Sequence, residues 1–194
     1  MTKLETKNIT FIAIMAALGN VLSFLTTQLV PLAPNIPIGP ISVSLALDIS
    51  HLSTFIAALF GGPLVGGITG AIGGLVAAFE FGFSKGNMVT GIGLPLGKAM
   101  TGFAAGILFN RYKLQSLIAS VGLTVTSYVP EAILTIVLFR FLLPSLMGLP
   151  IGIATLIGAQ IIVKAFFEMI ILGIILLIII RNQGLEGYLQ NNIR

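Results

Sequence analysis

Cysteine and tryptophan are absent from this 194-residue chain, and it contains a single histidine, His51. Without cysteine there is no disulfide, no thiolate nucleophile and no thiolate-ligated metal. One histidine is too few for the histidine pairs of common zinc sites, and no paired catalytic motif accompanies it. The sequence therefore predicts neither an enzyme nor a resident metal or cofactor.

Charged residues are also scarce, at 8% of the chain, whereas soluble domains contain about 25%. Hydrophobic residues make up 56%, and the mean hydropathy is +1.09. The net charge of +4 comes from scattered basic residues, which is not the pattern of a nucleic-acid-binding protein. The composition predicts an all-α integral membrane protein with a single domain, 1–194, and no room for a nucleotide-binding module.

A membrane crossing needs about 20 apolar residues, and the apolar runs predict a bundle of six transmembrane helices. The predicted helices cover residues 9–30, 43–59, 63–79, 91–109, 117–142 and 153–180. The first run is too long for the apolar part of a signal peptide, so we expect it to be retained. Four prolines from Pro31 to Pro40 predict an extended loop, and Pro130 predicts an interruption of the fifth helix. The polar segment 80–90 predicts a further loop.

Basic residues in the short flanks predict the orientation, because they collect on the cytoplasmic side. With both termini in the cytoplasm, that side carries Lys3, Lys7, Arg111, Lys113, Arg181 and Arg194. The outer side then carries only Lys85 and Arg140. We therefore expect a multi-pass protein of the cell membrane with both termini inside.

Several ionisable side chains fall inside the predicted helices, at similar depth in the outer half of the bundle. Such groups mark ligand or ion sites, because an unpaired charge in a membrane is costly. Asp48 and His51 lie three residues apart on one helix face; the partner of Asp48 is His51, Lys98 or a ligand, and His51 is otherwise a packing residue. The predicted substrate-binding residues are Asp48, His51, Asn87, Lys98, Tyr128 and Glu131.

Other polar and small residues have simpler interpretations. Lys164 and Glu168 are four residues apart and are predicted to pair with each other on one helix face, with ligand contact by Lys164 as the alternative. Glu80 and Lys85 are expected to be solvated loop residues. Glycines 62, 66, 70 and 74 predict close helix packing, and they lack the Gly-Lys-Ser ending of a phosphate loop.

The chain resembles the substrate-binding S components of energy-coupling factor (ECF) transporters, small vitamin-uptake proteins with six helices. Four features carry the resemblance over nearly the whole chain: Ala13-Ile14-Met15-Ala16-Ala17, the proline-rich first outer loop, Leu47-Asp48-Ile49-Ser50-His51 running to Phe60-Gly61-Gly62-Pro63, and the glycine-rich helix that follows. The segment around Asp48 is most similar to the riboflavin-type branch, which has Asp-x-Ser-Asp there; His51 replaces the second Asp. The lack of tryptophan argues against a thiamin-type site.

The resemblance implies that the chain binds a vitamin or related micronutrient, while a separate transmembrane coupling subunit and two ATPases supply the energy. It also implies that the S component topples in the membrane to deliver its cargo. Ala13 and Ala17 share one face of the first helix and would let a partner helix approach closely. We therefore expect this face to dock on the coupling subunit.

Two other functions remain open from the residues alone. A self-contained, proton-coupled secondary transporter would use Asp48, His51 and Glu131 as a proton relay. Such carriers often contain inverted repeats, and the two halves of this chain show no convincing similarity. A purely structural membrane subunit would explain the glycines but not the buried acids and lysines.

Overall fold

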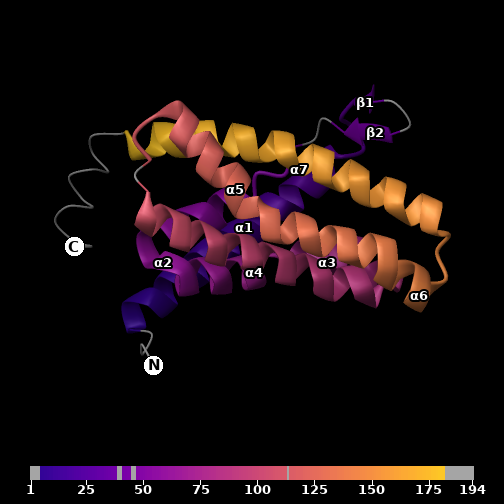
Figure 1. Ribbon diagram of the computed structural model, residues 1–194. Coiled ribbons are helices and arrows are strands. Elements are labelled where there is room, and N and C mark those ends of the chain that lie inside the picture. The colour runs from indigo at the N-terminus through magenta and orange to yellow at the C-terminus, as the bar shows by residue number, and fades with distance from the viewer. Residues whose placement is uncertain (1–4, 39–40, 45–46, 113, 182–194) are drawn as a thin grey trace.

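The computed structural model describes residues 5–38, 41–44, 47–112 and 114–181 (Figure 1). In this part of the chain, five segments are helical, long and apolar enough to cross a membrane: Thr6–Leu29, His51–Lys85, Met88–Arg111, Leu117–Met147 and Ile151–Ile180. The sequence predicts six crossings. The difference arises because the second and third predicted helices fall into one helical segment, His51–Lys85.

That segment begins with helix α2 (His51–Gly73), which reverses direction in its middle. Gly62 has φ 76° and ψ −167°, a non-helical conformation that glycine adopts readily, and Pro63 follows it. A Cβ on Gly66 would lie 2.6 Å from the Cβ of Ala58, although eight residues of straight helix would separate them by about 12 Å. The two halves of α2, residues 51–61 and 63–73, therefore pack against each other.

The second half of α2 also packs closely on α4 (Met88–Arg111). A Cβ on Gly66 would lie 2.6 Å from the carbonyl oxygen of Gly102, and a Cβ on Gly70 would overlap the backbone of Lys98. Larger residues would hold the two helices apart. The close packing predicted from the glycine spacing is confirmed at these two positions.

The proline-rich loop contains a β-hairpin, and the prediction that a helix begins at Val43 is wrong. Strand β1 (Asn35–Ile38) pairs antiparallel with β2 (Ile41–Ser44), with Asn35 opposite Ser44. The strand pairing occupies backbone groups at 43–44 that a helix there would have used, and α2 begins at His51.

A short helix, α3 (Leu75–Phe81), follows α2 after a break at Gly74. The side chain of Asn20 spans this break: its Nδ2 donates to the carbonyl of Ile72, and its Oδ1 accepts from the amide of Val76, both at 2.9 Å. Asn20 lies on α1 (Thr6–Leu29). It thereby satisfies two backbone groups and ties the break to the first helix.

The loop predicted over 80–90 is shorter in the structure. Helix α3 continues to Phe81, a 3-10 turn η1 covers Phe83–Lys85, and α4 begins at Met88. Asn87 caps α4, because its side chain accepts from the amide of Thr90. The cap satisfies a backbone donor at the helix start.

Helix α5 (Leu117–Val137) continues through Pro130, so the interruption predicted there is wrong. The departure from α-helical geometry comes later, in the π-helical segment η2 (Leu138–Leu142), which leads into the short helix α6 (Leu143–Met147). A proline is tolerated inside a membrane helix when neighbouring groups satisfy the freed backbone.

The last helix, α7 (Ile151–Ile180), packs on α5 along the bundle. The main apolar core lies where α2, α4, α5 and α7 meet, and it includes Phe55, Phe109, Tyr128, Met169 and Leu172. In Figure 1, α1 begins and α7 ends at the left end of the bundle, while α6 and the β-hairpin lie toward the right. Lys3, Lys113 and Arg194, which belong to the predicted cytoplasmic set, lie outside the described residues.

Candidate functional site

A buried lysine on α4 forms the centre of the first polar cluster. The side chain of Lys98 is only 4% exposed. Its Nζ donates to the hydroxyl of Ser50 and lies 3.5 Å from both Oδ2 of Asp48 and Oγ of Ser23. The structure thus selects Lys98 as the ionic partner of Asp48. Ser23 belongs to α1, so this cluster joins α1, α4 and the segment before α2.

The second cluster joins the start of α2 to α4 and α5. Nε2 of His51 lies 3.1 Å from Oε2 of Glu131, and the hydroxyl of Thr101 donates to the same oxygen at 2.5 Å. All three side chains are buried. Within the described part of the chain, Nδ1 of His51 is buried without a hydrogen-bond partner. A buried polar atom left unpaired costs about 1–3 kcal/mol.

Glu168 on α7 connects the first cluster to the last helix. Its Oε1 accepts a hydrogen bond of 2.7 Å from the backbone amide of Asp48. The same oxygen lies 3.6 Å from Nζ of Lys164, so the ion pair predicted from their spacing is confirmed. The contact with Asp48 has no signal in the sequence, because the two residues are 120 positions apart.

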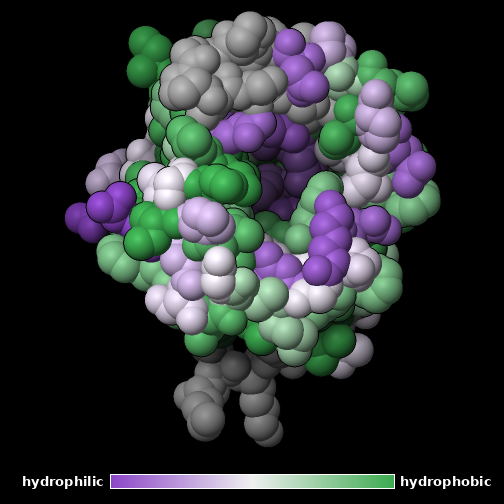
Figure 2. Space-filling model, turned by 90° about the vertical axis from the view of Figure 1, so that its right-hand side faces the viewer, coloured by the Kyte–Doolittle hydropathy of each residue, from purple (hydrophilic) through white to green (hydrophobic). Residues whose placement is uncertain are grey.

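These clusters lie deep in the bundle. At 1.5 Å per residue, Lys98 is about 15 Å below the start of α4, and Glu131 is about 16 Å from the end of η2. Figure 2 views the molecule from the end where α4 begins and η2 ends, and it shows a hollow there with hydrophilic surface deep inside. The clusters therefore lie near mid-depth, beneath an opening at the end that carries the β-hairpin and α6 (Figure 1).

The other predicted site residues take no part in these ion pairs. Tyr128 is 5% exposed and belongs to the apolar core. Asn87 caps α4, about 16 Å along that helix from Lys98. The structure thus brings Asp48, His51, Lys98 and Glu131 together, places Tyr128 in the core, and keeps Asn87 near the mouth of the bundle.

Four polar partners were not predicted: Ser23, Ser50, Thr101 and Glu168 as a backbone acceptor. The sequence spacing points to two of them: Ser50 is two residues from Asp48, and Thr101 is three residues from Lys98, about one helical turn away. Ser23 is an isolated serine in an apolar run. Nothing in the sequence separates it from a packing residue.

The predicted docking residues lie on the outer surface of α1. Ala13 and Ala17 are exposed, whereas Ile12 and Ala16 on the same helix are buried. Ala13 and Ala17 are therefore available to a partner and do not belong to the core of this bundle.

Lys85 is exposed, and its ammonium lies 5.4 Å from the ring centre of Phe81.

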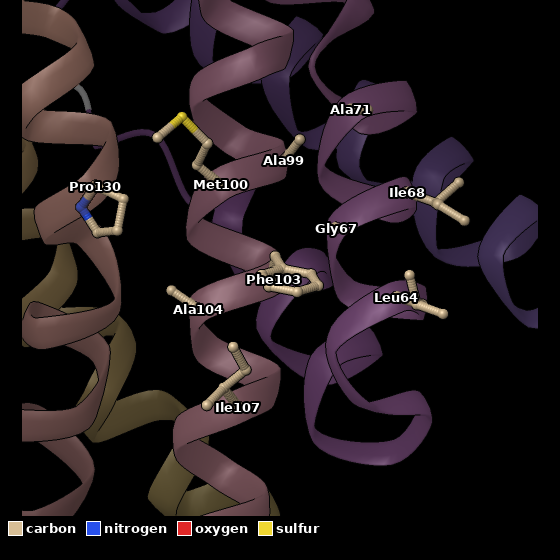
Figure 3. A pocket seen from close by; sticks show the side chains of 10 residues that line it. All are labelled: Leu64, Gly67, Ile68, Ala71, Ala99, Met100, Phe103, Ala104, Ile107 and Pro130. Atoms are coloured by element: carbon tan, nitrogen blue, oxygen red, sulfur yellow. The ribbon is translucent and has the colours of Figure 1, made fainter. Parts of the chain in front are cut away.

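A groove of about 640 Å³ lies on the side of the bundle, between α2, α4 and α5 (Figure 3). Apolar side chains and a glycine line it, including Leu64, Ile68, Phe103, Ile107 and Pro130. Leu64, Phe103 and Ile107 are between 46% and 48% exposed. The residues that line the groove offer no charge or hydrogen-bonding side chain, which sets it apart from the polar clusters inside the bundle.

The clusters have the chemistry of a binding site. Carboxylates, ammonium groups, hydroxyls and an imidazole lie within apolar walls, where they can fix the orientation of a small polar molecule. Among the described residues, no group of three or more histidine, aspartate or glutamate side chains could hold a metal ion.

Comparison with known proteins gives the family. A family model described as "ECF transporter, substrate-specific component" matches residues 7–180. A search of curated proteins found no match to the chain. Members of the matched family are substrate-binding membrane subunits of transporters, not enzymes, and they work with the other subunits of an ECF module. The buried polar clusters and membrane-spanning helices fit that role, and the chain belongs to the family of substrate-specific components of ECF transporters.

Proposed function

We propose that this protein captures a vitamin or related micronutrient from outside the cell and delivers it through a separate ATP-driven module. The family match over residues 7–180 carries the proposal. The hollow in Figure 2 and the charged groups at mid-depth support it, since both suit a small polar substrate. A transmembrane coupling subunit and two ATPase subunits would complete the transporter.

The proposal includes six membrane crossings with both termini in the cytoplasm. The reversal at Gly62 supports this count, because it divides α2 into two antiparallel halves. Helix α1 begins and α7 ends at the same end of the bundle (Figure 1), which supports an even number of crossings. The hollow then opens to the outside, and the basic residues Arg111 and Arg181 lie at the cytoplasmic end.

The substrate in this proposal is bound by Asp48, His51, Lys98 and Glu131, with Tyr128 nearby and Asn87 at the mouth. The ion pairs hold these side chains in place before the substrate arrives, which lowers the cost of ordering them on binding. The unpaired Nδ1 of His51 supports a ligand or water close to this cluster. A riboflavin-like substrate is compatible with the donors and acceptors present.

Docking on the coupling subunit is assigned to Ala13 and Ala17. Small exposed residues one turn apart let a partner helix approach the backbone of α1. This face is on the outside of the bundle. Docking and substrate binding would therefore use separate surfaces.

An uptake measurement tests the proposed function against a self-contained, proton-coupled carrier. Proteoliposomes would contain this chain alone or with a coupling subunit and two ATPases, and the transported compound would be the one that mass spectrometry identifies in the purified protein. Uptake that needs the ATPases and ATP, and that survives a proton uncoupler, supports the proposal. Uptake by the chain alone that the uncoupler abolishes would establish the carrier instead.

A further inference from the structure

We infer that Glu168 is a positioning residue for the substrate site: its carboxylate holds the segment 47–50 in place by accepting the backbone N–H of Asp48. We call this segment the strap. Its part in substrate binding rests on the function proposed above. The contacts that hold it are independent of that function.

The strap is held by side chains from three helices. The hydroxyl of Thr26 on α1 donates to the carbonyl of Leu47 at 3.3 Å. The ammonium of Lys98 on α4 donates to the hydroxyl of Ser50, and the carboxylate of Glu168 on α7 accepts from the amide of Asp48. A hydrogen bond of 2.9 Å from the amide of Ser50 to Oδ1 of Asp48 closes the turn within the strap.

The geometry favours this role for Glu168 over simple pairing with Lys164. Oε1 of Glu168 lies 2.7 Å from the Asp48 amide nitrogen but 3.6 Å from Nζ of Lys164. The Glu168 side chain is 6% exposed, whereas that of Lys164 is 24% exposed. Hydrogen bonds to a buried charged group are among the stronger ones in proteins. Lys164 then balances the charge of Glu168 from the more open side.

The position of the strap matters for both polar clusters. Asp48 lies within it, and His51, which pairs with Glu131, is the first residue of the helix that it starts. If Glu168 releases the Asp48 amide, Asp48 loses its anchor to α7, and the strap is left with its links to α1 and α4. Glu168 would thus fix the distance between the charged groups of α4 and α5 and those of the strap without itself contacting the substrate.

Thiol accessibility in the purified protein without substrate tests this inference. The chain has no native cysteine, so Leu47→Cys supplies a single reporter in the strap, and its reaction with a methanethiosulfonate reagent is timed. We expect Glu168→Leu to raise the reaction rate about tenfold or more, because the acceptor is lost. Glu168→Gln keeps a carbonyl acceptor and Lys164→Met keeps the carboxylate, so both should remain within about threefold of the parent rate.

Two results would overturn the inference. An unchanged rate in Glu168→Leu would mean that Glu168 does not hold the strap. Equal acceleration in Glu168→Gln, Lys164→Met and Glu168→Leu would mean that the ion pair, and not the bond to the Asp48 amide, holds it. Thermal unfolding of each variant would show whether the whole bundle is loosened.

Amide hydrogen exchange at Asp48 gives a second test that needs no leucine variant. In the unmodified protein, we expect this amide to exchange slowly, because it is hydrogen-bonded to a buried carboxylate. We expect Glu168→Gln to keep much of that protection. Fast exchange of the Asp48 amide in the unmodified protein would contradict the inference even if Glu168→Leu does not fold. Neither test involves transport, so a result against the role of Glu168 leaves the proposed function standing. A result against the proposed function likewise leaves the contacts of the strap standing.

Discussion

Substituting Gly66 by alanine should destabilise the protein by separating the two halves of α2 from each other and from α4. The new Cβ would lie 2.6 Å from the Cβ of Ala58 and 2.6 Å from the carbonyl oxygen of Gly102. Carbon atoms prefer about 3.5–4.0 Å, so the backbones would have to move apart by about 1 Å. Overpacking of this kind costs about 1–3 kcal/mol.

Gly122→Ala on α5 is the matched control, because its added Cβ meets nothing within 4 Å beyond its chain neighbours and the backbone of its own helix. Both substitutions gain the helix propensity of alanine, about 1 kcal/mol, so the difference between them isolates the packing cost. Equilibrium unfolding in mixed micelles should place Gly66→Ala about 1–3 kcal/mol below Gly122→Ala in the free energy of unfolding. Equal stabilities would refute the close contact and, with it, the reversal of α2 at Gly62.

Three further predictions concern docking, topology and the break between α2 and α3. Ala13→Trp or Ala17→Trp should leave substrate affinity nearly unchanged while abolishing complex formation and uptake, because the new side chain fills only the outer face of α1. A pull-down with the coupling subunit measures complex formation. A variant that neither folds nor binds substrate would place the alanines in the core. A cysteine at Asn35 should react with an impermeant reagent from outside the cell and one at Tyr112 should not, whereas the opposite labelling would reverse the topology. Asn20→Leu should cost about 2 kcal/mol or more in the free energy of unfolding, since two backbone groups lose their partners; an unchanged unfolding curve would mean that water replaces the amide.

Much of the helical architecture could be predicted from the sequence, because it follows from apolar runs. The predicted helices 91–109 and 153–180 lie within α4 and α7, and the predicted helix 9–30 runs one residue past the end of α1 at Leu29. The predicted start of the second helix, Val43, lies eight residues before the observed start of α2 at His51. Residues 41–44 are apolar enough for a helix, and only their pairing with 35–38 makes them a strand.

The charged residues and the histidine of the buried clusters could be predicted from the sequence, but their hydroxyl partners and their pairings could not. An acid, a lysine or a histidine in an apolar helix needs a partner, and this requirement singles out Asp48, His51, Lys98 and Glu131. Which residue pairs with which depends on the packing of α2 on α4 and α5, which sequence spacing does not encode. Asn87 has a local role that the prediction did not include, because its side chain caps the start of α4.

The π-helical segment after α5 had no sequence signal either. Pro130 drew attention to its own turn, yet α5 remains helical there and changes geometry at Leu138. Leu138 and Phe139 in that segment pack with Leu143 in a small buried cluster. The departure from regular geometry thus coincides with a buried contact, and a rule about proline alone could not find the place.

Substrate affinity of matched carboxylate variants tests the central claim most directly, namely that the buried clusters bind the substrate. The compound retained by the purified protein would be identified by mass spectrometry and titrated against Asp48→Asn, Glu131→Gln and the control Glu80→Gln, which lies on α3 outside both clusters. The account predicts that each of the first two weakens binding about tenfold or more, through loss of a charged hydrogen-bonding group, while the control binds as the parent does. Unchanged affinity in both Asp48→Asn and Glu131→Gln would contradict it.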